Sequence, residues 1–149
     1  MKLRARTLWL SGLLVSLLAA CGGGAGVPAA GPGAPASATA VERFLQLARQ
    51  KDYVQMGWVF GTADGPIIER YPRPEVERRM YGIAEVLASD SFTVGTGSPV
   101  PGRIGRAESF SVRLQRGSLT SRVPITVVLG NDRRWFVEVV AVQAITNAP

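Results

Sequence analysis

From residue 41 onward, apolar residues first recur every three or four positions, which is the period of an α-helix. The first apolar stripe contains Val41, Phe44, Leu45 and Ala48. Polar residues fill the positions between them, so this segment is predicted to be an amphipathic helix that ends near Lys51. Thr39 and Glu42 have the Thr-x-x-Glu spacing of a capping box, which places the start of the helix at Thr39.

Two further helices are predicted before residue 90. The segment from Tyr53 to Phe60 is predicted to be a short helix, because Gly61 and the turn at residues 64–66 stop it. A longer helix is predicted from Pro74, since proline is well suited to the first helical position. Its apolar stripe contains Val76, Met80, Ile83 and Leu87.

Beyond Ser89 the hydrophobic period changes to two, which predicts four strands separated by turns. The side chains expected on the inner face are Phe92, Val94, Phe110, Val112, Leu114, Val123, Ile125 and Trp135. Pro124 cannot donate a ladder hydrogen bond, so part of the third strand is predicted to be an edge or a bulge. Helices followed by an antiparallel meander predict an α+β fold, with the N-terminal helices packed on one face of a four-stranded antiparallel sheet.

The opposite face of the last strands also carries apolar residues. They are Val128, Phe136, Val140 and Val142, interrupted by Glu138. A strand that is apolar on both faces suggests that its outer face is covered. The cover is expected to be a second copy of the chain or an envelope protein partner. A curved sheet that tolerates exposed valines is the alternative.

The first 21 residues show a different pattern. Lys2, Arg4 and Arg6 precede an apolar run of 11 residues from Leu8 to Leu18, whereas a membrane-spanning helix needs about 20. Leu18-Ala19-Ala20-Cys21 follows, and this arrangement resembles the lipobox of bacterial lipoproteins. The resemblance implies that residues 1–20 are a signal peptide and that Cys21 is the lipid attachment site. The domain would then be exported and held by acyl chains to the outer membrane or the extracytoplasmic face of the inner membrane.

Residues 22–40 contain six Gly, three Pro and seven Ala and no charged residue. Such a segment buries too little apolar surface to offset its chain entropy, so residues 21–40 are predicted to be the lipidated cysteine and a flexible linker. Fully stretched, the linker would reach about 65 Å. Residues 41–147 are then expected to form a single α+β domain.

Removal of residues 1–20 also changes the charge. The whole chain has a formal net charge of +6, and three of its basic residues lie in the signal peptide. The remaining basic residues are dispersed along the chain, so no nucleic acid partner is expected. Export of an unfolded chain argues against a cofactor loaded beforehand, and no cofactor is expected.

The chain contains no histidine, which excludes Ser-His and Cys-His nucleophilic sites and imidazole metal sites. Acylation of Cys21 would remove the only thiol. Glu108 shares the inner face with Phe110 and is the single candidate for acid–base catalysis, although no second carboxylate is clearly paired with it. No metal site and no catalytic residue are therefore predicted.

An aromatic pocket is the remaining candidate site. Its predicted lining is Tyr53, Trp58, Phe60, Phe92 and Trp135. Such residues suit a small hydrophobic ligand, and the alternative is that they are simply core residues.

The order of elements and the last strand, Arg-Arg-Trp-Phe-Val-Glu-Val-Val-Ala-Val, resemble the cone-shaped nuclear-transport-factor-like superfamily, close to cystatin-like folds. This superfamily includes enzymes, binding proteins and assembly domains, so the resemblance implies a fold rather than an activity. The function expected is a membrane-anchored envelope lipoprotein whose domain is a non-catalytic binding or assembly module. The alternatives are a protein that binds a small hydrophobic ligand and a cone-pocket enzyme that uses Glu108.

Overall fold

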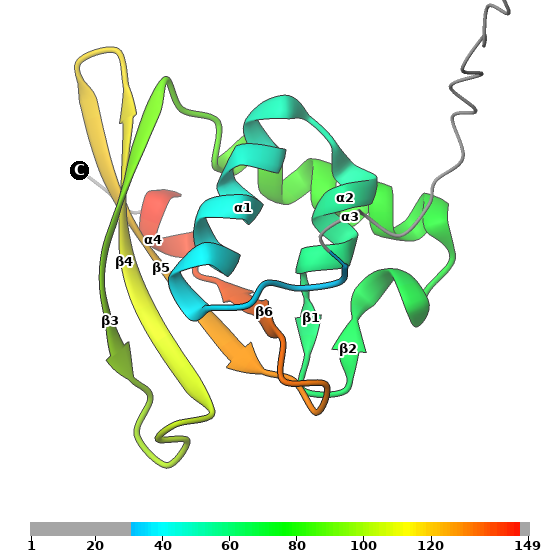
Figure 1. Ribbon diagram of the computed structural model, residues 1–149. Helices are drawn as coiled ribbons and strands as arrows, with labels where there is room; N and C mark the ends of the chain where they lie inside the picture. Colours follow the sequence, from blue (N-terminus) through cyan, green and yellow to red (C-terminus); the bar gives the residue numbers. More distant parts are fainter. Residues whose placement is uncertain (1–30, 147–149) are drawn as a thin grey trace, which may run out of the picture.

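The computed structural model describes residues 31–146, in which helices precede a four-stranded antiparallel sheet (Figure 1). The helices are α1 (Ser37–Gln50), α2 (Tyr53–Val59), the 3-10 turn η1 (Ile67–Glu69), α3 (Arg73–Val86) and α4 (Gln143–Thr146). The sheet strands are β3 (Ser91–Pro99), β4 (Ala107–Arg116), β5 (Leu119–Leu129) and β6 (Trp135–Val140). A two-stranded ribbon, β1 (Gly61–Thr62) and β2 (Gly65–Pro66), follows α2. The predicted α+β class is confirmed.

The helices lie close to where the apolar periodicity predicts them. The first ends at Lys51, whose φ of 58° and backbone N–H bonds to Leu47 and Ala48 form a left-handed cap. α3 begins at Arg73, one residue before the predicted start, so Pro74 lies in its first turn but is its second residue. The predicted capping box is wrong, because α1 begins at Ser37 with Ala36 as its N-cap residue and no side-chain cap. Thr39 therefore lies inside the helix rather than at its start.

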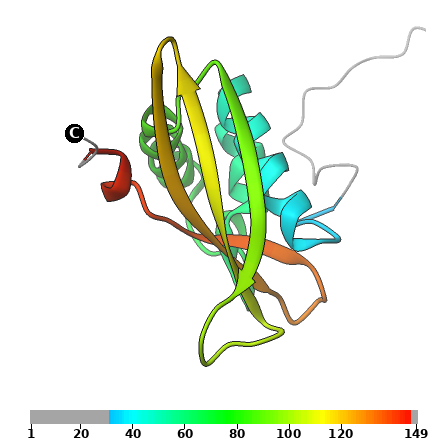
Figure 2. The same cartoon turned by 90° about the vertical axis from the view of Figure 1, so that its left-hand side faces the viewer.

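The strands pair in the order β3-β4-β5-β6, which is the predicted meander. The helices α1, α2 and α3 cover one face of this sheet, as the two views show (Figures 1 and 2). The core lies between them and contains fully buried side chains from both layers. The largest are Phe44, Leu45, Met56, Met80, Leu87 and Ile125. None of the helices in residues 31–146 is both long and apolar enough to cross a bilayer.

A bulge at Glu138 changes the predicted faces of β6. Val137 is opposite Val127, but Val139 is opposite Thr126, so β6 has one extra residue between these pairs. Val140 therefore packs against the core instead of the outer face, and Val139 is 49% exposed. The prediction that Val140 faces outward is wrong, because one inserted residue shifts every later side chain of the strand to the opposite face.

Pro124 lies at an edge of the sheet, as predicted. The ladder between β5 and β6 ends at the pair of Ile125 and Val140, and the N–H of Ala141 then donates to the carbonyl oxygen of Pro124 (3.0 Å). Within a strand, the N–H and C=O of one residue point to the same side. The missing N–H of Pro124 therefore faces the end of the β5–β6 ladder, where the pair of Pro124 and Ala141 has only the bond that Ala141 donates.

Residues 31–40, predicted as part of the linker, belong to the folded domain. Ala34 is fully buried and exchanges two backbone hydrogen bonds with Trp135, of 2.9 and 2.8 Å. The N–H of Gly33 donates to the carbonyl oxygen of Trp58 (2.8 Å). The segment thus covers the free edge of β6, which a composition of Gly, Ala and Pro does not reveal. The predicted signal peptide, Cys21 and the remainder of the linker lie outside the described residues.

Candidate functional site

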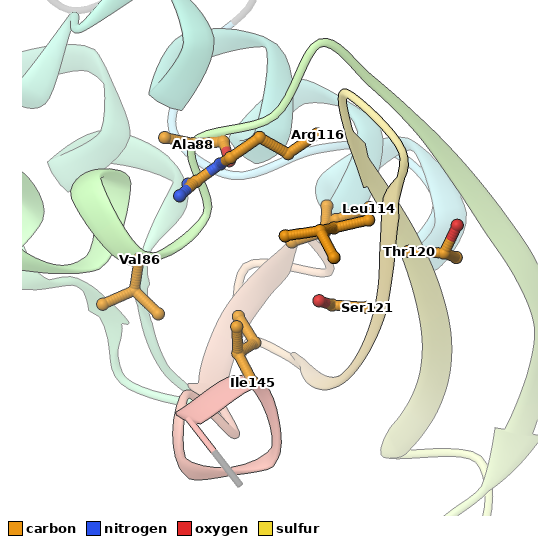
Figure 3. A pocket seen from close by; sticks show the side chains of 8 residues that line it. Val86, Ala88, Leu114, Arg116, Thr120, Ser121 and Ile145 are labelled. Atoms are coloured by element: carbon orange, nitrogen blue, oxygen red, sulfur yellow. The ribbon is translucent and has the colours of Figure 1, made fainter. Parts of the chain in front are cut away.

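A hollow of about 270 Å³ lies where β4 turns into β5, between the sheet, the end of α3 and α4. Its lining residues are Val86, Ala88, Leu114, Arg116, Leu119, Thr120, Ser121 and Ile145. We call it the β4–β5 hollow. Val86, Leu114 and Ile145 reach into it from three different elements, and Arg116 extends along its rim toward Ala88 (Figure 3). Its walls are apolar and its rim is polar.

The unequal lengths of β5 and β6 create this hollow. Because β6 pairs with β5 only from Ile125 onward, the first half of β5 has no neighbour on that side. The short helix α4 packs on β5 instead and contributes Ile145. Leu114 is the last apolar inner-face residue of β4 and is opposite Ser121 of β5. The side of the hollow away from β4 is therefore closed by a single turn of helix rather than by a strand.

Arg116 and Asp90 hold the β4–β5 turn against the chain that leaves α3. The Nε of Arg116 donates to the carbonyl oxygen of Ala88 (2.8 Å), and a second nitrogen of its guanidinium donates to the same oxygen. The carboxylate of Asp90 accepts a hydrogen bond from the N–H of Gly117 (2.7 Å). Leu119, the first residue of β5, is 70% exposed at the mouth of the hollow. A small molecule with an apolar body and a polar or anionic end matches these walls and this rim.

The structure does not bring the predicted aromatic pocket together. The ring of Tyr53 packs edge-on against Tyr81, with centroids 5.7 Å apart. Phe60 packs against Phe44 of α1 at 5.8 Å. Four of the five predicted residues pack on the margin of the core, namely Tyr53, Phe60, Phe92 and Trp135. The backbone of Trp58 binds Gly33, and its indole Nε1 is buried without a hydrogen-bond partner in the described residues. The geometry favours the core alternative.

Phe60 does line a second, smaller hollow of about 200 Å³ at the edge of β6. Glu138, the bulged residue of β6, also lines it, and its carboxylate accepts two hydrogen bonds from Arg103 (2.7 and 3.1 Å). This pairing raises the pKa of Arg103. The guanidinium of Arg79 stacks over the ring of Tyr71, 4.4 Å from its centroid. Because Arg103 and Glu138 are 35 residues apart, no local sequence pattern predicts their pairing.

Glu108 lies half-buried on β4, as the sequence places it, opposite Val127 of β5. One carboxylate oxygen lies 2.9 Å from the position that a Cβ on Gly97 would occupy. No hydrogen bond or ion pair joins Glu108 to another side chain within residues 31–146. The same part of the chain contains no group of three or more potential metal ligands of the Asp, Glu, His and Cys types.

The apolar residues predicted on the outer face are covered by the chain itself. Val128 is 3% exposed and Phe136 is fully buried. The ring of Phe136 lies against Gly33 and Gly130, whose hypothetical Cβ atoms would come within 2.9 and 2.7 Å of it. These residues therefore present no apolar surface to a second copy. No family model, no curated protein and no solved structure matches this chain.

Proposed function

We propose that the chain is a lipid-anchored protein of the bacterial cell envelope whose domain binds a small molecule and does not catalyse a reaction. The sequence Leu18-Ala19-Ala20-Cys21 supports the anchor. The β4–β5 hollow is the observation that carries the binding role, because apolar walls and a cationic rim meet there on the open end of the sheet. The domain takes the nuclear-transport-factor-like cone fold, which is supported by helices that precede and cover an antiparallel meander.

The ligand we propose is a small amphipathic carboxylate. Val86, Leu114 and Ile145 would remove its hydrocarbon part from water, at about 0.8 kcal/mol for each methylene group. Arg116 already donates to a carbonyl oxygen, and it retains a guanidinium N–H group for a carboxylate at the rim. Ser121 adds a hydroxyl group from β5, whereas the hydroxyl of Thr120 already donates to Oε1 of Gln115. An assembly role remains the second candidate, because Leu119 is 70% exposed beside the hollow.

Thermal unfolding tests this proposal. The chain from residue 22 onward, without lipid, retains every described contact and is the sample of choice. We expect octanoate to raise its Tm, and octanol, which lacks the carboxylate, to raise it less. A ligand present at a hundred times its Kd stabilises the folded state by about 2.7 kcal/mol. For a domain of this size, that corresponds to a rise of about 10 °C.

Two exposed residues provide a matched comparison for the same measurement. Leu119→Ser alters the mouth of the hollow, whereas Ile104→Ser alters an even more exposed residue, 78% exposed, in the loop between β3 and β4. We expect Leu119→Ser to reduce the shift caused by octanoate and Ile104→Ser to leave it unchanged. If neither octanoate nor octanol shifts the Tm, or if both variants respond like the wild type, the hollow is not the binding site.

A further inference from the structure

The two halves of the described chain differ in charge. Residues 91–140, which include the whole sheet, contain seven arginines and only three acidic residues. Residues 31–90, which include the three long helical segments, contain seven basic and eight acidic residues. Three of the seven arginines in residues 91–140 have partners. Arg103 pairs with the carboxylate of Glu138, Arg116 donates to the carbonyl oxygen of Ala88, and Arg134 donates to the carbonyl oxygen of Pro32. Of these partners only Glu138 carries a charge, so the excess positive charge lies on the arginines other than Arg103.

Arg113 and Arg122 are two such residues, and they are directly opposite each other across β4 and β5. Both are exposed, and alternation with the buried Val112 and Val123 places them on the outer face, away from the helices. Neither forms an ion pair or a side-chain hydrogen bond within residues 31–146. Like charges at opposed positions destabilise a sheet. An anion bound between the two guanidinium groups would relieve this repulsion.

The surroundings of the pair suit such an anion. Arg113 and Arg122 line a shallow hollow of about 290 Å³ together with Thr93, Gly95 and Ser111. Gly95 lies at the bulge of β3 and has no side chain to fill this space. The hydroxyl groups of Thr93 and Ser111 are additional donors, and no carboxylate lines the hollow. Guanidinium and hydroxyl donors of this kind match the oxygens of a phosphate group. We call this surface the arginine face.

The chain enters the domain at the free edge of β6, beside α1 (Figure 1). Phe136, Val128 and Ala107 are paired across three strands and share one face. Alternation along β4 from Ala107 places Arg113 on that face too. Gly33 packs against the ring of Phe136, and Arg43 of α1 donates to the carbonyl oxygens of Gly31 and Gly33 (3.2 and 2.7 Å). The entry point therefore lies at the free edge of β6, next to the helix layer.

The distance to the anchor is short. Ten residue steps separate Cys21 from Gly31, the first described residue. Ten residues of extended chain span at most about 35 Å, which is the upper limit of the distance between Cys21 and Gly31. A ten-residue strand such as β4 is about 33 Å long. The domain is therefore held within roughly its own length of the lipid headgroups, where anionic phospholipids are the most concentrated source of phosphate.

We propose that the arginine face, formed around Arg113 and Arg122, docks on the anionic phospholipid headgroups of the membrane that holds Cys21. The inference rests on the lipid anchor of the proposed function. The β4–β5 hollow would then lie on the other face of the same two strands, separated from the membrane by the sheet. Acyl chains on Cys21 hold the protein to the membrane, and the arginine face orients it there.

Vesicle co-sedimentation of the lipid-free chain from residue 22 tests the docking without the anchor. Residues 31–146 contain the whole core, so this chain folds independently of its lipid. We expect it to bind phosphatidylcholine vesicles that contain phosphatidylglycerol, at low salt, and not to bind pure phosphatidylcholine. Each arginine near an anionic surface contributes about fivefold to the affinity, so R113S/R122S should bind about thirtyfold more weakly.

The variant R49S/R78S removes the same charge from α1 and α3, at two exposed arginines without ion-pair partners in the described residues. We expect it to bind nearly as the wild type does. Equal losses in the two variants would mean that only net charge matters and would overturn the proposal. So would a lack of binding to the anionic vesicles. A third contrary result concerns inorganic phosphate, whose binding is measured by calorimetry. If R113S/R122S lost phosphate binding but kept vesicle binding, the two arginines would not be the docking site for the membrane. None of these outcomes depends on acylation of Cys21.

Discussion

Replacement of Phe136 by alanine is expected to destabilise the domain by about 3–5 kcal/mol, the usual cost of removing a fully buried aromatic ring. The ring fills the space between β6, Gly33 and Gly130, and neither glycine has a side chain that can move into the cavity. Its loss also removes the surface on which the N-terminal segment packs. Urea unfolding of the chain from residue 22 onward measures the change in the free energy of unfolding.

Val139→Ala is the control on the same strand. Val139 is 49% exposed because the bulge at Glu138 turns it outward. Its truncation is expected to cost no more than about 0.5 kcal/mol. A similar loss in the two variants would contradict both the position of the bulge and the burial of Phe136.

Gly33→Ala is expected to detach the N-terminal segment from β6. Gly33 has a φ of +60°, and a Cβ there would lie 2.8 Å from the carbonyl oxygen of Trp135 and 2.9 Å from the ring of Phe136. The left-handed conformation costs about 1–2 kcal/mol for a residue with a Cβ, and the overlap adds about 1–3 kcal/mol. Hydrogen exchange at the amides of Gly33 and Ala34 should accelerate, because these amides donate to Trp58 and Trp135.

Gly31→Ala separates the two costs. Gly31 has a φ of +71°, but its hypothetical Cβ meets only a guanidinium nitrogen of Arg134 at 4.0 Å. This variant should therefore lose only the conformational part, about 1–2 kcal/mol, and should retain slow exchange at Ala34. Equal losses of stability in the two variants would indicate that Gly33 is not packed against β6.

The periodicity of apolar residues was sufficient to predict the main elements. A helix with an apolar stripe such as Val41, Phe44 and Leu45 is stable only when that stripe faces the core. In the same way, a strand with alternating residues such as β4 is stable only when its apolar face is buried. The bulge at Glu138 escaped prediction because the inserted residue is decided by pairing with β5. The folding of residues 31–36 was not predicted, because this segment is held by backbone hydrogen bonds of Gly33 and Ala34. Side-chain composition gives no sign of such bonds.

The candidate site was less predictable than the fold. Aromatic residues predicted around a pocket became the margin of the core; Phe60, for example, packs directly on Phe44 of α1. The β4–β5 hollow depends on the point at which β6 stops pairing, near Ile125. The arginine face depends on the register that sets Arg113 opposite Arg122.

The described fold also shortens the predicted linker. Residues 22–30 remain between Cys21 and the domain, in place of residues 22–40. The maximum reach falls from about 65 Å to about 35 Å. If Cys21 carries the proposed lipid anchor, the domain would act at the membrane surface itself rather than far across the envelope. The short linker would keep the arginine face and the β4–β5 hollow close to the membrane that holds the anchor.

Membrane fractionation of the wild type and Cys21→Ser, expressed in a bacterial host, tests the anchor on which this account depends. We expect the wild type to stay in the membrane pellet after a high-salt wash, since two or three acyl chains hold a protein stably. We expect Cys21→Ser to be released by the same wash, because salt screens the charges of the arginine face. Retention of Cys21→Ser in the washed pellet would contradict the lipid anchor.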